Sequence, residues 1–228
     1  MTDGLQVLAE ALDGGVELVL RRRTRPVGEP VLELVVDGVF AMDSTDVSTE
    51  VALAEQALAG LTGRAAPWTV AVGGLGLGFT AAAVLADPRV GRLVVIELHA
   101  AVADWARQGL LPVAGLALRD PRTQLVMGDV LTAVPSLSPP VDALLLDVDN
   151  GPDFLVHAGN AAIYGQGFLA AAAAVMRPGG VLGIWSADRS PDLQQRLERA
   201  VGACREVRLA VERDGHAFSY SLFLATRE

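Results

Sequence analysis

A run of glycines followed at a fixed distance by one acid is the clearest chemical feature of this chain. Gly74, Gly76 and Gly78 come directly after an apolar stretch, and Glu97 ends the next apolar stretch nineteen residues later. A turn without side chains, between a strand and a helix, lets backbone N–H groups approach a ligand closely. An acid at the end of the next strand can accept hydrogen bonds from both hydroxyls of a ribose. These residues predict a site for a ligand that contains a nucleoside.

A purely structural role is the alternative for both features. Glycine turns also permit close packing between a helix and a strand, and an acid at the end of a strand is often simply solvated. The combination of strand, turn and spacing favours the ligand. We therefore place Leu98, the neighbour of Glu97, at the same site, and we expect Thr80 to cap the helix that follows the glycines.

Asp129 follows a third apolar stretch, at residues 123–127. The carboxyl ends of parallel strands meet at one edge of a sheet, so this acid is expected on the ligand side. Its carboxylate can accept a hydrogen bond from an adenine amino group, with Gly128 and Val130 beside it. Asp129 can also be the N-cap of the short helix after it, and the two roles are compatible.

Two further acids follow the fourth apolar stretch, which ends at Leu146. Asp147 and Asp149 would be crowded and partly buried there, a setting that perturbs carboxyl pKa values. A carboxylate at this position can accept the proton of an amine while that amine attacks a sulfonium carbon. Asp147 and Asp149 are therefore the candidate catalytic residues. The alternative is a simple turn, because the sequence Asp-Asn-Gly-Pro favours turns.

Composition limits the classes of function. The 228 residues are 51% hydrophobic and carry a net charge of −9, which indicates a globular protein and argues against nucleic-acid binding. All 18 basic residues are arginine, so chemistry that needs a lysine, such as a Schiff base or a P-loop, is excluded. The three histidines have no spacing suited to a metal, so we expect none.

The chain is predicted to be cytoplasmic. Cys204 is the only cysteine, so no internal disulfide can form and a reducing compartment is expected. The N-terminus lacks the basic-then-apolar pattern of a signal peptide. The apolar run 168–176 is far shorter than the roughly 20 residues that span a bilayer, so no membrane association is expected.

The pattern of elements changes near residue 43. Residues 1–43 predict a β-rich segment, with a short helix over 5–12, strands at 16–23 and 31–36, and a hairpin turn at Asp37-Gly38. Residues 44–228 predict the ligand-binding domain. Its first helix is expected to be capped by Ser44 or Thr45 and to end near Gly60. Beyond it we expect strands at 69–73, 92–97, 123–127, 142–147, 180–185, 206–211 and 217–225, and helices at 79–86, 99–109, 131–134, 160–176 and 190–202.

This alternation predicts an α/β fold with a doubly wound, mostly parallel seven-stranded sheet and a small N-terminal β hairpin piece. The last two strands are separated only by residues 212–216, so they must form an antiparallel hairpin. A parallel sheet that ends in such a hairpin is the class I methyltransferase-like Rossmann arrangement. It favours S-adenosylmethionine or a related ligand over a dinucleotide.

At this level of detail the chain resembles the polyamine aminopropyltransferases, the spermidine synthase-like proteins. The resemblance covers most of residues 16–186. The segments that carry it are LELVVDGVFAMD, VAVGGLGLGFTAAAVL, VVIELHAAVADWAR, DPRTQLVMGD, DALLLDVDNGP and RPGGVL. In common methyltransferases an acid usually stands at the position of Val72, so this residue also aligns the chain with the aminopropyltransferases.

The resemblance implies a donor, an acceptor and roles for particular residues. The donor would be decarboxylated S-adenosylmethionine or S-adenosylmethionine, and the acceptor a small molecule bearing an amine. Glu97 would hold the ribose, Asp129 would lie near the adenine, and Asp147 would deprotonate the acceptor amine. Asn150 and Tyr164 would contact the acceptor. The family also implies a homodimer.

Two other functions stay open. The family's glycine turn usually contains an aspartate where this chain has Leu77, and that aspartate helps to hold the donor's ammonium group. A small-molecule methyltransferase that uses intact S-adenosylmethionine in the same site is therefore an alternative. A nucleoside-binding, non-catalytic or regulatory relative is the other.

Overall fold

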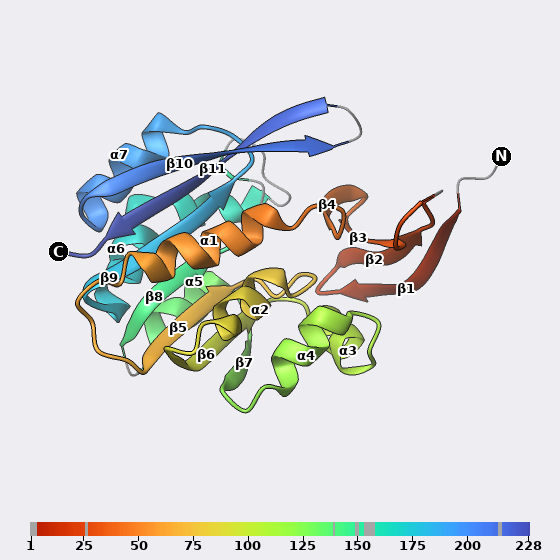
Figure 1. Ribbon diagram of the computed structural model, residues 1–228, viewed down its shortest axis with the longest axis horizontal. Helices are drawn as coiled ribbons and strands as arrows, with labels where there is room; N and C mark the ends of the chain where they lie inside the picture. The colour runs from red at the N-terminus through yellow and green to blue at the C-terminus, as the bar shows by residue number, and fades with distance from the viewer. Residues whose placement is uncertain (1–3, 26, 139, 149–150, 153–157, 214–215) are drawn as a thin grey trace.

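The structure is a computed structural model that describes residues 4–25, 27–138, 140–148, 151–152, 158–213 and 216–228. It contains two β-sheets (Figure 1). The smaller sheet is antiparallel, with the order β1-β2-β3-β4, and it projects from one side of the larger sheet. Its strands are β1 (Leu5–Asp13), β2 (Val16–Arg23), β3 (Val31–Val36) and β4 (Val39–Asp43).

The larger sheet has seven strands in the order β10-β11-β9-β8-β5-β6-β7. Strand β11 runs antiparallel to its two neighbours, β10 and β9. The pairs β9-β8, β8-β5, β5-β6 and β6-β7 are parallel. This confirms the predicted doubly wound sheet and its terminal hairpin. The strands are β5 (Trp68–Gly73), β6 (Val90–Glu97), β7 (Thr123–Met127), β8 (Val141–Leu146), β9 (Met176–Ser186), β10 (Cys204–Arg213) and β11 (His216–Thr226).

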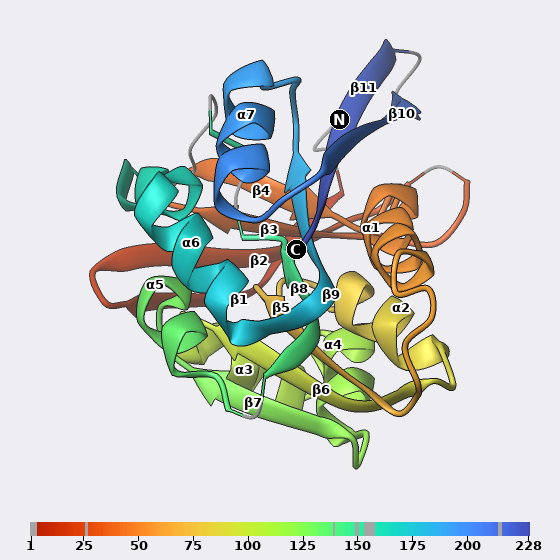
Figure 2. The same cartoon turned by 90° about the vertical axis from the view of Figure 1, so that its left-hand side faces the viewer.

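Helices cover both faces of the larger sheet (Figure 2). The helices are α1 (Ser48–Ala59), α2 (Phe79–Ala86), α3 (Ala100–Arg107), α4 (Pro112–Arg119), α5 (Val130–Ala133), α6 (Gln166–Val175) and α7 (Pro191–Ala200), with the 3-10 helices η1 (Val134–Ser136) and η2 (Ala158–Tyr164). One hydrophobic cluster lies between the sheet and the helices α1, α2 and α4. A second cluster lies on the other face, under α5, α6 and α7.

Strand β8 shows why the central strands are continuously apolar. Leu145 packs into the cluster on the α1 side, whereas Leu144 and Leu146 pack into the cluster on the α6 side. All three are almost fully buried. Because successive side chains of a strand point to opposite faces, a strand covered on both faces needs apolar residues at every position.

The N-terminal segment corrects two predictions. Residues 5–12 form strand β1, not a helix, and this strand pairs with β2 along its whole length. The N-terminal piece is thus a four-stranded sheet rather than a hairpin. The stretch is rich in leucine and alanine, which favour helix, but hydrogen bonds to the neighbouring strand outweigh the weak local preference.

Helix boundaries bring three further corrections. Neither Ser44 nor Thr45 caps α1; its N-cap is Val47, and the Asp46 carboxylate accepts the Ser48 N–H at 2.9 Å. The predicted helix over 160–176 is divided, because Gly165 is extended (φ −77°, ψ 148°) between η2 and α6. Helix α4 was not predicted, although Pro112 at its first turn is a known start signal.

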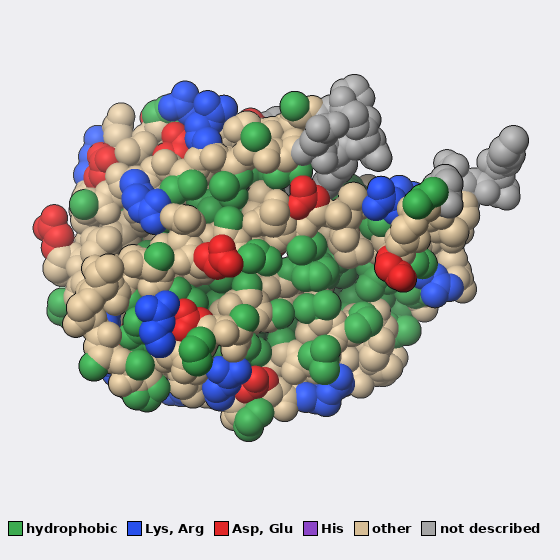
Figure 3. All heavy atoms as spheres, viewed as in Figure 1, with side chains coloured by type: hydrophobic (Ala, Val, Ile, Leu, Met, Phe, Trp, Pro, Cys, Tyr) green, Lys and Arg blue, Asp and Glu red, His purple; other side chains and the backbone are tan. Residues whose placement is uncertain are grey.

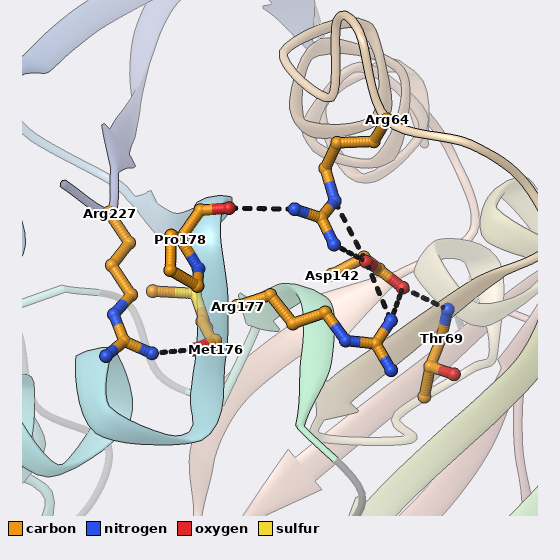
Figure 4. A network of polar contacts seen from close by, with 7 residues as sticks. All are labelled: Arg64, Thr69, Asp142, Met176, Arg177, Pro178 and Arg227. Carbon is orange, nitrogen blue, oxygen red and sulfur yellow. Dashed lines mark hydrogen bonds and ion pairs between the residues drawn. The ribbon is translucent and has the colours of Figure 1, made fainter.

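A polar network fastens the amino-terminal ends of the central strands (Figure 4). The Asp142 carboxylate is almost fully buried and accepts hydrogen bonds from Arg64 (2.9 and 2.5 Å), Arg177 (3.2 Å) and the Thr69 N–H (2.7 Å). Arg64 also donates to the Pro178 carbonyl at 2.7 Å. Arg227 adds a bond to the Met176 carbonyl. The network joins the entry to β5, the start of β8 and the start of β9, at the sheet edge opposite the site described below.

Candidate functional site

A cavity of about 760 Å³ lies where the N-terminal sheet meets the carboxyl ends of the central strands. Its lining comes from both sheets, from α1 and from the loops that follow β5, β6, β7, β8 and β9. Hydrophobic side chains gather on the face where the N-terminal sheet joins the rest of the molecule (Figure 3). The cavity thus occupies the position at which ligands bind in open α/β sheets.

The glycine turn is shaped by three left-handed glycines. Gly74 (φ +90°) and Gly76 (φ +48°) line the cavity. A Cβ on Gly74 would lie 2.2 Å from the Asp147 carbonyl oxygen, so this turn touches the end of β8 directly. Gly78 (φ +96°) is not among the lining residues; a Cβ there would lie 2.4 Å from the Ala114 backbone. The structure therefore brings Gly74 and Gly76 to the site and gives Gly78 a packing role between α2 and α4.

Glu97 joins the turn to the next loop. Its carboxylate accepts hydrogen bonds from the Leu75 N–H and the His99 N–H, both at 2.8 Å. A carboxylate offers about four acceptor positions, so capacity is left for a ligand. Burial raises the pKa of the Glu97 carboxyl, and the two backbone hydrogen bonds partly oppose that rise. Glu97 and the half-exposed Leu98 both line the cavity.

Asp129 has one of the two roles predicted for it, that of a helix N-cap. It is the N-cap of α5, and its side chain accepts the Leu131 N–H at 2.8 Å. Gly128, Asp129 and Val130 all line the cavity. The second predicted role, contact with an adenine, stays a prediction.

Asp147 lies at the carboxyl end of β8, beside the glycine turn. The backbone N–H of Asp147 donates a hydrogen bond to the Gly73 carbonyl at 3.0 Å. Its Oδ2 accepts a hydrogen bond from the Thr80 hydroxyl at 2.6 Å. Burial raises the pKa of the Asp147 carboxyl, and the hydrogen bond from Thr80 acts in the opposite direction. Thr80 does not cap α2, whose N-cap is Gly78; its hydroxyl is bonded to this carboxylate instead.

The remaining predicted site residues are Asp149, Asn150 and Tyr164. Asp149 and Asn150 lie outside the described residues. Tyr164, at the end of η2, is 2% exposed and borders a separate cavity of about 280 Å³. From the same 3-10 helix, Asn160 and Ile163 line the main cavity instead.

Sequence reasoning missed most of the carboxylates around the cavity. Eight acids line it: Asp13, Asp43, Asp46, Glu50, Glu97, Asp129, Asp147 and Asp188. The described lining contains no arginine, and the chain has no lysine. Half of these acids belong to the N-terminal sheet, to the residues leading into α1 or to the first turn of α1. Nothing local in the sequence marks them, because only the packing of the small sheet brings them to the cavity.

Aromatic side chains form another part of the wall. The rings of Trp185 and Tyr220 lie 5.0 Å apart with planes 36° from parallel, and both line the cavity with Phe40 and Phe218. The wall thus combines acids with apolar surface. Leu77, at the position of the family's aspartate, is 2% exposed and packs in the α1-side core, not in the described lining.

Comparison with solved structures identifies the architecture. A spermidine synthase in complex with the transition state analogue AdoDATO superposes with a TM-score of 0.79, over 98% of this chain and 74% of that one, at 16% identity. This chain has the fold of the spermidine synthases. A spermidine synthase from Thermotoga maritima superposes with a TM-score of 0.77, over 98% of this chain and 73% of that one, at 16% identity. A probable spermidine synthase from Corynebacterium glutamicum gives a TM-score of 0.70, over 97% and 79%, at 14% identity.

The likeness confirms the fold expected from the resemblance. No family model matches the chain, and no curated protein matches it in sequence. Within the described residues, no cluster of three or more potential metal ligands is found. None of the helices in the described part of the chain has the length and apolar character needed to cross a bilayer.

Proposed function

We propose that the protein transfers an aminopropyl group from decarboxylated S-adenosylmethionine to a small acceptor that carries an amine. The observation that carries this proposal is the charge of the cavity, which is lined by eight carboxylates, with His99 as the only basic side chain in the described lining. An ammonium group loses its hydration on entering such a site and needs carboxylates in exchange. The cavity therefore suits ligands with several positive charges.

The same charge favours the decarboxylated donor over the intact one. Both donors carry a sulfonium and an ammonium group, but intact S-adenosylmethionine also carries a carboxylate. Two like charges about 6 Å apart repel by roughly 3 kcal/mol at an effective dielectric constant of about 20. With no described arginine on the wall to offset it, that repulsion selects against the intact donor.

The residues fit the reaction in complementary ways. Glu97 and Asp129 have acceptor capacity for the nucleoside, and the glycines leave room for it. When bound, the donor supplies a sulfonium-activated carbon. The acceptor nitrogen forms a bond to that carbon, the carbon–sulfur bond breaks with its electron pair going to sulfur, and Asp147 takes the proton released from the nitrogen. Because burial raises the pKa of Asp147, its ionised form is a stronger base than an exposed aspartate.

A turnover assay tests the proposal. The protein is incubated with decarboxylated S-adenosylmethionine and a panel of mono-, di- and triamines, and mass spectrometry follows the aminopropylated amine and methylthioadenosine. We expect both products in equal amounts, with turnover reduced at least about 100-fold in Asp147→Asn. Asp104→Asn, in an exposed ion pair, is the control and should keep full activity. Absence of product with every amine would contradict the proposal.

Small-molecule methyl transfer is the second candidate. Its support is Leu77, whose buried side chain stands in place of the acid with which the aminopropyltransferases hold the decarboxylated donor, so one reason to prefer that donor is missing. Replacing the donor by intact S-adenosylmethionine in the same assay separates the two functions, because methyl transfer then gives a methylated acceptor and S-adenosylhomocysteine. Binding of the nucleosides without any turnover would favour the non-catalytic alternative.

A further inference from the structure

The hydroxyl of Thr80 has an unusual partner for a residue in the first turn of a helix. It donates to Oδ2 of Asp147 at 2.6 Å, across 67 residues of sequence, and Thr80 is 4% exposed. An ionised carboxylate can only accept, so the hydroxyl is the donor. The bond joins α2 to the end of β8.

The surrounding packing holds both partners in place. Gly78 lies against the Ala114 backbone and fixes the start of α2, and Gly74 lies against the Asp147 carbonyl. Threonine is branched at Cβ and has few side-chain conformations in a helix. The hydroxyl therefore meets Oδ2 at a set position, and among the described residues no protein group donates to Oδ1.

Other titratable groups share the wall of the cavity with Asp147. The titratable side chains on its wall are Asp13 on β1, Asp43 on β4, Asp46 and Glu50 at α1, Glu97 and His99 around the end of β6, Asp129 after β7, Asp188 after β9 and Tyr220 on β11. Seven of these are acids, and His99 is the one basic side chain among them. Burial raises the pKa of the Asp147 carboxyl, and the hydrogen bond from the Thr80 hydroxyl opposes that rise.

We propose that Thr80 is a positioning residue that orients Asp147 and keeps it ionised for proton acceptance. The inference rests on the proposed function for its catalytic consequence, but the hydrogen bond can be tested without turnover. A hydrogen bond to a charged group contributes about 1.5–3 kcal/mol, which corresponds to roughly 10–100-fold in an equilibrium or a rate.

The first test is a titration. The carboxyl carbon of Asp147 is followed by NMR against pH in the parent, Thr80→Ala, Thr80→Val and Thr80→Ser, with Asp147→Asn to assign the signal. We expect the midpoint to move to higher pH by about one unit or more in the alanine and valine variants and to stay at the parent value in the serine variant. Equal midpoints in folded parent and Thr80→Ala, or a serine variant that behaves like alanine, would overturn the proposal.

The second test is the pH profile of turnover. Loss of the hydroxyl should lower kcat about 10–100-fold near neutral pH, move the acidic limb of the profile to higher pH, and leave KM for the donor within about 2-fold. Thr123→Val is the matched control, because the buried Thr123 hydroxyl has no hydrogen-bond partner in the described structure. A shifted titration in a protein that shows no turnover would retain the role of Thr80 and reject the proposed function. An unshifted titration with active enzyme would do the reverse.

Discussion

Replacement of Gly74 by alanine tests how tightly the glycine turn is fitted to the end of β8. Alanine is unfavourable here for two reasons. It would have to adopt the left-handed backbone of Gly74 (φ +90°), and its Cβ would lie 2.2 Å from the Asp147 carbonyl oxygen. The first costs about 1–2 kcal/mol and overpacking typically another 1–3 kcal/mol. We expect Gly74→Ala to lose roughly 2–5 kcal/mol of unfolding free energy. Its affinity for methylthioadenosine should also fall, because the turn must move away from Asp147.

Gly109→Ala is the matched control. Gly109 has nearly the same backbone angle (φ +84°), but a Cβ there would meet nothing within 4 Å. The Gly109→Ala variant should lose only about 1–2 kcal/mol of unfolding free energy and should keep its affinity for methylthioadenosine. Urea denaturation followed by tryptophan fluorescence gives the unfolding free energy of both variants, provided the slope of that free energy against urea concentration is unchanged. Equal losses in the two variants would refute the close contact between the turn and β8.

Three further predictions concern acids. Glu97→Gln should lower nucleoside affinity about 10-fold or more in calorimetry, since an amide nitrogen cannot accept the backbone hydrogen bonds, whereas the exposed Glu10→Gln should not change it. Asp142→Ala should cost roughly 2–4 kcal/mol in urea denaturation, because the partly exposed Arg64 and Arg177 and the Thr69 N–H all lose a buried acceptor. The exposed ion pair broken in Asp104→Ala should cost under about 1 kcal/mol. The folded state raises the pKa of Asp147, so this group stabilises the protein below about pH 4 and that contribution is lost as the pH rises. The stability of Asp147→Asn relative to the parent should therefore increase from pH 4 to pH 8, and a constant difference would contradict the direction of the shift.

The parts of the site that follow single strands were predictable from the sequence. Gly74, Glu97, Asp129 and Asp147 each come directly after an apolar stretch, and parallel strands place their carboxyl ends at one edge. Local pattern and sheet geometry are sufficient there. The mostly parallel sheet of seven strands and its antiparallel last strand also followed from the alternation of elements and from the short final hairpin.

The parts that depend on packing between distant segments were not predictable. Asp43 on β4 and Glu50 in α1 line the same cavity because its wall is shared by the N-terminal sheet, α1 and the loops of the larger sheet. Thr80 has the spacing of a helix cap, and only the close approach of α2 to β8 gives its hydroxyl another partner. Tyr164 is buried in the α6-side cluster, at the end of a 3-10 helix that is separated from α6 by the extended Gly165.

The preference between the two sulfonium donors tests the central claim most directly. The protein is titrated calorimetrically with decarboxylated S-adenosylmethionine, with intact S-adenosylmethionine and with methylthioadenosine as the reference without the amino acid part. An acid-lined cavity without described arginine predicts that the decarboxylated donor binds at least about 10-fold more tightly than the intact one. Equal or tighter binding of intact S-adenosylmethionine, or no binding of any of the three, would contradict the account.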